Sequence, residues 1–189
     1  MPRRKISFIQ GHYYHIYNRG AGRQPIFRES ENYLYLLRLL KRVLVDLQIS
    51  MIAYCLLPNH YHWLVRQDGE TAVNQLPKRV FGSYTQAFNK KYQRTGTLFE
   101  GPFKAKYVNN GAYLYQLCAY IHRNPVKHGL ADSLEAWPFS NYPEWIGIRA
   151  GTLIDRNFIL SHFPNGQQYE EFVRDCIFQE AVSFLEDES

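Results

Sequence analysis

Short apolar and aromatic runs separated by turn residues mark the strands that this chain is expected to form. Residues 13–18 (YYHIYN) and 49–57 predict two of them, and residues 60–66 predict a third. The Pro58-Asn59 turn between the last two predicts a hairpin. Residues 96–108 predict further extended segments, interrupted at Gly101-Pro102.

A helical spacing of apolar residues separates these strands. It predicts helices over residues 29–47, 71–92 and 110–123. Ser30 is expected to cap the first helix, and the third is expected to stop before Pro125, because the residue before a proline disfavours helical geometry.

The resulting order is β-α-β-β-α-β followed by another helix. This order predicts an α+β fold with a ferredoxin-like antiparallel sheet and helices on one face. Residues 1–145 are expected to form one domain. Residues 146–189 are expected to form a helical C-terminal extension, ending in an acidic amphipathic helix from about residue 167 to 185.

Charge is unevenly distributed along the chain. Residues 1–66 carry ten Lys and Arg against three acids, and residues 78–128 carry nine against one. Residues 164–189 carry one Arg against seven acids. A basic body suits a polyanion-binding surface, and the 16% aromatic content suits stacking on unpaired bases. A solvated basic face and an aromatic core are the structural alternatives.

The cellular compartment is inferred from the absence of membrane-spanning and signal-peptide patterns in the sequence. It contains no apolar run of membrane-spanning length, and the MPRRKISF start has no signal-peptide core. Cys55, Cys118 and Cys176 form no CxxC pair and are interpreted as reduced, mostly buried thiols. A cytoplasmic, nucleoid-associated protein without a membrane partner is expected.

His60-Tyr61-His62 on the third predicted strand is the first candidate site. Alternate residues of a strand share a face, so both imidazoles project together and Tyr61 points into the core. Two neutral imidazoles can share a divalent ion and leave coordination positions open for phosphate and water. Two structural strand histidines would give the same triplet.

Tyr120 and Asn124 form the second candidate site. Four residues apart on a helix, they lie on the same face. Tyr120 can supply a phenolic nucleophile and Asn124 a carbonyl oxygen as a third metal ligand. Tyr113 competes for the same face two turns away, and Tyr115 is expected to pack or stack elsewhere.

These residues lie within longer motifs that resemble a known family. YCLLPNHYHWLV is similar to the metal motif of the insertion-sequence-200-like transposases, and AYIHRNPVKHGL to the nucleophile helix of their REP-associated tyrosine branch. YYHIYNRGAGRQPIF, GTLFEGPFKAKYV and WPFSNY match further family motifs in the same order. The matches extend over residues 13–142.

The resemblance implies a single-tyrosine His-hydrophobic-His endonuclease domain with a basic N-terminal arm. It implies that His60 and His62 bind a Mg²⁺ or Mn²⁺ ion, that Asn124 completes the site, and that Tyr120 cleaves DNA through a 5′-phosphotyrosine. Better-known relatives have Gln at the position of Asn124, which is one methylene shorter and makes its ligation less secure.

The implied partner is single-stranded DNA beside an imperfect hairpin, cut and rejoined by a monomer or a homodimer. Candidate phosphate contacts are the basic residues Arg3, Arg4, Lys5, Lys78, Arg79, Lys90, Lys91, Arg94, Lys104, Lys106, Arg123 and Lys127. His122 is interpreted as a backbone or DNA contact, with His128 a possible proton acceptor.

Two rival functions remain open from the sequence. One is a DNA-hairpin binding protein that has lost catalysis, against which the intact set of His60, His62, Tyr120 and Asn124 argues. The other is a metal-dependent hydrolase with a water nucleophile, which would form no covalent adduct with DNA.

Overall fold

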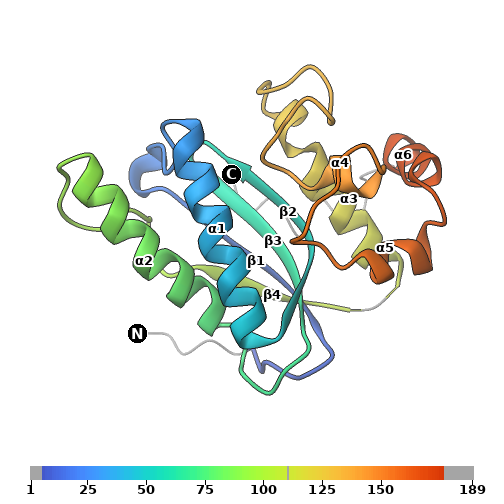
Figure 1. Ribbon diagram of the computed structural model, residues 1–189, viewed down its shortest axis with the longest axis horizontal. Coiled ribbons are helices and arrows are strands. Elements are labelled where there is room, and N and C mark those ends of the chain that lie inside the picture. Colours follow the sequence, from blue (N-terminus) through green and yellow to red (C-terminus); the bar gives the residue numbers. More distant parts are fainter. Residues whose placement is uncertain (1–5, 110, 177–189) are drawn as a thin grey trace.

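A four-stranded antiparallel sheet organises the molecule (Figure 1). The structure is a computed structural model that describes residues 6–109 and 111–176. The strands are β1 (Tyr13–Arg19), β2 (Ile49–Leu57), β3 (His60–Gln67) and β4 (Lys104–Val108), in the spatial order β2-β3-β1-β4. This order, with antiparallel neighbours throughout, confirms the ferredoxin-like α+β prediction.

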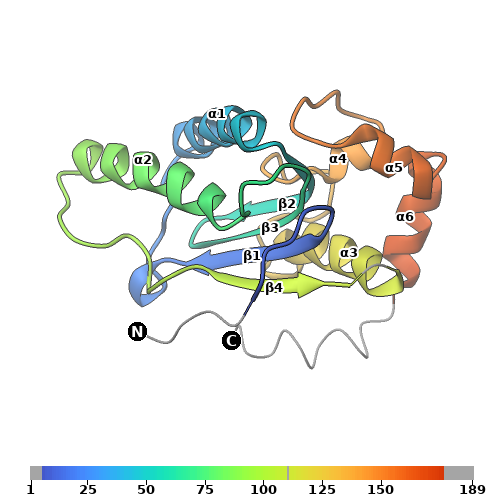
Figure 2. The ribbon, with the colours of Figure 1, turned by 90° about the horizontal axis from the view of Figure 1, so that it is seen from below.

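Helices α1 (Ser30–Leu47) and α2 (Gln75–Lys91) cover one face of the sheet (Figure 2). Their apolar stripes pack on the strand residues that point to that face, including Tyr14, Tyr61 and Trp63, all fully buried. The prediction of helices on one face therefore holds for the two helices of the β-α-β-β-α-β unit. Burial of these large aromatic side chains is the main favourable contribution to this layer.

The opposite face of the sheet carries a second core. Helix α3 (Ala112–Lys127) packs there on β2, and α4 (Tyr142–Trp145), α5 (Arg156–His162) and α6 (Gly166–Asp175) pack beyond it. A bulge between Met51 and Ala53 shifts the β2 register. Alternate β2 residues Ala53, Cys55 and Leu57 then face α3.

Two local predictions about helix ends were wrong. Ser30 is the first helical residue and Glu29 occupies the cap position, without a side-chain cap bond. Helix α3 continues through Pro125 to Lys127. A proline near the end of a helix removes a single backbone bond, and the last turn is closed by the His128 N–H donating to the Asn124 carbonyl (3.0 Å). Asn124 is therefore held in regular helical geometry.

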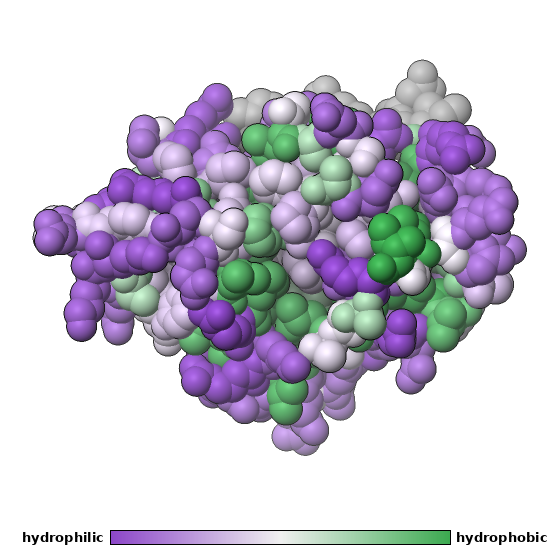
Figure 3. Space-filling view, turned by 45° about the horizontal axis from the view of Figure 1, so that its top comes forward, coloured by the Kyte–Doolittle hydropathy of each residue, from purple (hydrophilic) through white to green (hydrophobic). Residues whose placement is uncertain are grey.

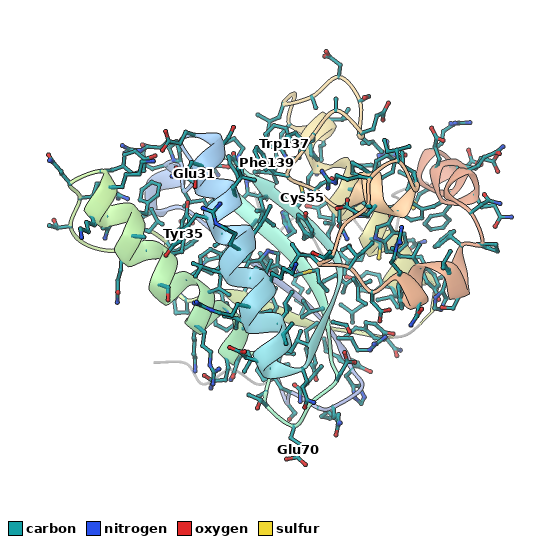
Figure 4. All side chains as sticks on the ribbon, viewed as in Figure 1. Glu31, Tyr35, Cys55, Glu70, Trp137 and Phe139 are labelled. Carbon is teal, nitrogen blue, oxygen red and sulfur yellow. The ribbon has the colours of Figure 1, made fainter. Side chains whose placement is uncertain are left out.

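The free edge of β2 is covered by an irregular segment, residues 137–141. The Leu56 N–H donates to the Phe139 carbonyl (2.9 Å), and the Trp137 indole N–H donates to the Leu56 carbonyl (3.0 Å). Figure 4 shows Trp137 and Phe139 side by side near Cys55. Pairing of these backbone groups protects an edge strand that would otherwise be open to another chain.

The C-terminal predictions are met only in part by the described residues. Helix α6 begins at Gly166 as expected, and the expected continuation to residue 185 lies outside the described residues, as do Arg3, Arg4 and Lys5. No helix in the described ranges is long and apolar enough to cross a membrane. All three cysteines are free thiols. Hydrophilic side chains dominate the face in Figure 3, with hydrophobic ones in small separate groups.

Candidate functional site

Strand alternation places His60 and His62 on the face of the sheet that carries α3. Their rings lie 5.3 Å apart, centroid to centroid. Tyr61 points to the other face and is fully buried against Trp63 and Phe81. The predicted geometry of the HYH triplet is confirmed, because the two imidazoles share a face and the residue between them belongs to the core.

A cavity of about 470 Å³ opens beside these histidines. Strands β1, β3 and β4, the start of the β1–α1 loop and the end of α3 all contribute to its wall. Side chains with cationic or metal-binding chemistry form more than half of the lining: Arg19, Arg23, His60, His62, Lys104, Lys127 and His128. Glu100 is the one acid among the described residues of the lining, and it forms an ion pair with Arg19 (3.2 Å). A cavity with this lining attracts an anionic ligand, because several cations converge where water is partly excluded.

Each of the two histidines is held through its Nδ1 atom. His60 Nδ1 lies 2.7 Å from Asn59 Oδ1, and His62 Nδ1 lies 3.1 Å from Nε2 of His15 on β1. Both imidazoles are neutral at pH 7: burial, with His128 and Arg19 nearby, lowers the pKa of His60 to about 4. Burial also holds the pKa of His62 well below its usual value. Neutral imidazole is the form that binds a metal ion.

Asn124 lies on the last turn of α3 and is 1% exposed. Its amide nitrogen donates to the Tyr120 carbonyl (2.9 Å), whereas its Oδ1 is buried without a hydrogen-bond partner in the described part of the chain. Asn124 does not line the cavity itself. A buried acceptor without a partner is costly, so this oxygen calls for a ligand or a water molecule.

Tyr120 is brought to the histidines by the packing of α3 on β2. Its ring lies 5.7 Å from that of His62, in an edge-to-face arrangement, and it lines the cavity. The ammonium group of Lys127 lies 5.3 Å from the Tyr120 ring centroid. The structure therefore brings together the two predicted histidines and the predicted tyrosine, although about sixty residues separate them in the chain.

The competing tyrosines have different surroundings. Tyr115 packs against Phe158, His162 and Phe163 of the C-terminal helices, with ring centroids 5.0–6.4 Å apart. Its expected packing role is confirmed. Tyr113 is half-buried next to the second core and does not line the cavity.

His122 was expected to contact DNA or backbone, and this was wrong. It is fully buried on the side of α3 that faces the C-terminal helices. Its Nδ1 lies 2.7 Å from the Tyr169 hydroxyl and its Nε2 lies 2.9 Å from Asn141 Oδ1. Both ring nitrogens are therefore used within the protein. We call His122, Asn141 and Tyr169 the docking cluster, because they join α3, the β2 edge and α6.

The predicted phosphate contacts fall into three groups. Lys104 and Lys127 line the cavity, and Lys106 lies near it with its ammonium group 5.8 Å from the Tyr17 ring. Arg123 donates to the Val173 carbonyl (3.1 Å) and so joins α3 to α6. The remaining described candidates lie on or just after α2, the helix layer across the sheet from the cavity: Lys78, Arg79, Lys90, Lys91 and Arg94.

Sequence reasoning missed several residues of this cavity. Arg19, Arg23 and Tyr17 line it, and the His15 ring contacts His62 Nδ1 without lining the cavity. His15 and Tyr17 alternate along β1 on the same face, and Tyr17 pairs with His62 across the β1–β3 ladder. The alternation was visible in the sequence, but the neighbour of β1 in the sheet was needed to connect it with the histidine pair.

A family model described as IS200-like transposase matches residues 8–124, which is more than half of the chain. The chain therefore belongs to the IS200-like transposase family.

Known proteins that resemble this chain include two REP-associated tyrosine transposases. A protein from Haemophilus influenzae named as a REP-associated tyrosine transposase is 30% identical over 107 residues, a match that covers 48% of this chain and 57% of that protein. A solved structure of a REP-associated tyrosine transposase bound to a REP hairpin is 20% identical, with a TM-score of 0.67, and covers 82% of this chain and 94% of that one. The latter likeness supports the fold.

Proposed function

We propose that this chain is a metal-dependent DNA endonuclease and strand transferase that uses Tyr120 as its nucleophile. Its substrate is single-stranded DNA next to a hairpin, and the covalent intermediate is a 5′-phosphotyrosine. The single observation that carries this proposal is the convergence of Tyr120 with His62, whose rings lie 5.7 Å apart in a cavity lined by cations.

The donor set of the site fits a divalent ion such as Mg²⁺ or Mn²⁺. His60 and His62 are neutral and share one face, and the buried Asn124 Oδ1 is an acceptor without a partner among the described residues. In the described ranges, no three His, Cys, Asp or Glu side chains are arranged to hold a metal ion. Two histidines with one amide oxygen would leave positions open for substrate oxygens, as a catalytic site requires.

When bound, the ion would neutralise negative charge on the scissile phosphate. The Tyr120 oxygen loses its proton and attacks phosphorus in line, the bond from phosphorus to the 3′-oxygen breaks, and the 3′-oxygen takes up one proton and leaves as a free 3′-hydroxyl. The ester energy is kept in the phosphotyrosine bond. Attack on that bond by a second 3′-hydroxyl restores the phenol and seals a new junction, so strand transfer needs no nucleotide cofactor.

Cationic side chains of the cavity position the DNA backbone. Arg19 and Arg23 approach from the end of β1 and the following loop, Lys104 from β4 and Lys127 from the end of α3. They come from different elements and line one cavity, which suits the binding of a phosphate group of the DNA backbone. The hairpin preference is proposed by analogy with the REP-hairpin complex of the structural relative.

The decisive experiment uses an end-labelled DNA hairpin with a single-stranded flank, incubated with the protein and Mn²⁺ and resolved on a denaturing gel. Wild type is expected to cleave the flank and to carry label into a covalent protein–DNA band. Tyr120→Phe is expected to lose both. Tyr115→Phe is the matched control, because Tyr115 lies on the same helix and packs away from the cavity.

Other outcomes identify the rival functions. Cleavage that persists in Tyr120→Phe without an adduct indicates a hydrolase with a water nucleophile. Tight hairpin binding with no cleavage by wild type, at any Mn²⁺ or Mg²⁺ concentration, indicates a binding protein without catalysis. Either result overturns the proposal.

A further inference from the structure

His15 is a buried histidine on β1 that contacts the candidate metal site without lining the cavity. It is fully buried, and its Nε2 lies 3.1 Å from His62 Nδ1. Its ring stacks on that of His62, with centroids 5.3 Å apart and an interplanar angle of 18°. Tyr17 stacks on His15 as well, at 4.8 Å. The rings of His15 and Tyr17 both stack on that of His62 and so restrict its orientation.

A neutral imidazole carries one proton, so its two nitrogens have opposite roles. The Nδ1 of His62 faces His15, and a metal ion in the cavity would therefore bind Nε2. Nε2 can bind only if the proton resides on Nδ1, and that N–H then needs an acceptor. His60 is arranged the same way, with its Nδ1 placed against an amide oxygen of Asn59.

We propose that His15 is a positioning residue for His62. It accepts the His62 Nδ1–H through its own Nε2, and so directs the Nε2 lone pair of His62 toward the ion. This inference rests on the proposed function, since it assumes an ion at His62. His15 itself binds no metal and touches no substrate.

This hydrogen bond leaves a buried N–H of His15 without a partner among the described residues, and that has a consequence that can be measured. When His15 accepts through Nε2, its own proton resides on Nδ1, which is buried and has no hydrogen-bond partner in the part of the chain that the structure describes. In the reverse arrangement, in which His15 Nε2–H donates to His62 Nδ1, this nitrogen is instead a buried acceptor without a partner there, which folded proteins tolerate more readily than a buried N–H without one. Without a metal, the reverse arrangement is favoured. Metal binding therefore reverses the direction of the hydrogen bond between His15 and His62.

Mn²⁺ affinity, measured by titration calorimetry on the intact protein without DNA, tests the role of His15. His15→Phe keeps the shape of the ring and removes the acceptor, so Mn²⁺ affinity is expected to fall about 10–100-fold, the usual effect of losing a hydrogen-bond partner of a ligand. His15→Gln, whose amide oxygen can accept, is expected to recover at least part of it. His12→Phe, a histidine beside Tyr107 outside the cavity, serves as the control.

Ring-nitrogen chemical shifts of wild type provide a second test that needs no variant. His62 is expected to carry its proton on Nε2 in metal-free protein and on Nδ1 after Mg²⁺ loading. An unchanged Mn²⁺ affinity in folded His15→Phe, or a metal-loaded His62 that keeps its proton on Nε2, overturns the role of His15 and leaves the proposed function standing. If wild type shows no Mn²⁺ binding that depends on His62, the proposed metal site fails, and the role of His15 with it.

Discussion

Two clusters of buried histidine lie on different sides of helix α3, and they differ in how completely their polar atoms are paired. In the docking cluster, both nitrogens of His122 have partners, the Tyr169 hydroxyl and Asn141 Oδ1. Asn141 also donates to the Ile52 carbonyl (2.9 Å). In the site cluster, formed by His15, His60 and His62, the buried His15 Nδ1 has no partner among the described residues. Oδ1 of Asn124, the predicted third ligand, has none there either, although Asn124 does not line the cavity.

The difference separates a structural role from a ligand-binding one. Burying a polar group is tolerated when folding itself supplies its hydrogen bonds, as the docking cluster does. A buried polar group that folding leaves unpaired lowers stability unless another component pairs it. The hydrogen bonds of the docking cluster are therefore supplied by the protein alone. Near the candidate site, Asn124 Oδ1 calls for a ligand or a water molecule, whereas His15 Nδ1 lacks a partner among the described residues whether or not an ion binds at His62.

The largest expected effect is the loss of DNA cleavage when a histidine of the site cluster is replaced. His60→Ala removes a proposed ligand, and cleavage of the hairpin substrate is expected to fall about 10²–10³-fold, as it does when a major group that stabilises charge in a transition state is lost. His12→Ala, outside the cavity, should cleave like wild type. Single-turnover rates with Mn²⁺ measure the effect. A His60→Ala rate within about fivefold of wild type would remove His60 from the proposed site.

The second prediction concerns stability with and without metal. Saturating the site with Mn²⁺ at a hundred times its Kd is expected to stabilise the fold by about 2.7 kcal/mol, and so to raise Tm by roughly 5–10 °C. The increment should vanish in His60→Ala and persist in His122→Leu. Differential scanning calorimetry with and without EDTA measures it. Equal increments in all three proteins would show that the ion binds elsewhere.

The sequence predicted the strands well because their pattern is local. β2 was predicted at its observed bounds, and the face shared by His60 and His62 follows from alternation along one strand. The proximity of Tyr120 to that face required the family resemblance, because helix periodicity does not specify which strand a helix packs against. The same limit explains the error at His122, whose partners lie 19 and 47 residues further along the chain.

His15 shows a different limit of sequence reasoning. Its strand was predicted, but its contact with His62 depends on the register of β1 against β3, which the pattern of residues along the chain does not determine. Arg123 shows the limit for surface charge: it was expected to bind phosphate, and its guanidinium donates to the Val173 carbonyl. The sequence gives the charge of a side chain, but the packing of the helices determines which group that side chain contacts.

The third prediction concerns variants that remove hydrogen bonds from the docking cluster. His122→Leu keeps an apolar side chain in the core but leaves the Tyr169 hydroxyl without its partner, so unfolding free energy is expected to fall by about 2 kcal/mol. Tyr169→Phe is the matched variant, because it removes only the hydroxyl and should cost about 1 kcal/mol. Urea unfolding of metal-free protein measures both. A His122→Leu variant as stable as wild type would show that the cluster contributes no net stability.

The last prediction concerns the pH dependence of that same cluster. Burial lowers the pKa of His122 from 6.5 to about 4. A folded-state pKa below the unfolded value means that the unfolded chain takes up a proton first. The stabilisation is therefore fully present above pH 6.5 and is lost as pH falls toward 4, at up to roughly 1.4 kcal/mol per pH unit. The difference in unfolding free energy between wild type and His122→Leu in EDTA should shrink from pH 7 to pH 4.5. The other buried histidines are common to the two proteins, so their titration cancels in this difference. A constant difference over that range would mean that the folded and unfolded chains take up the His122 proton alike, so that burial does not lower the pKa of His122.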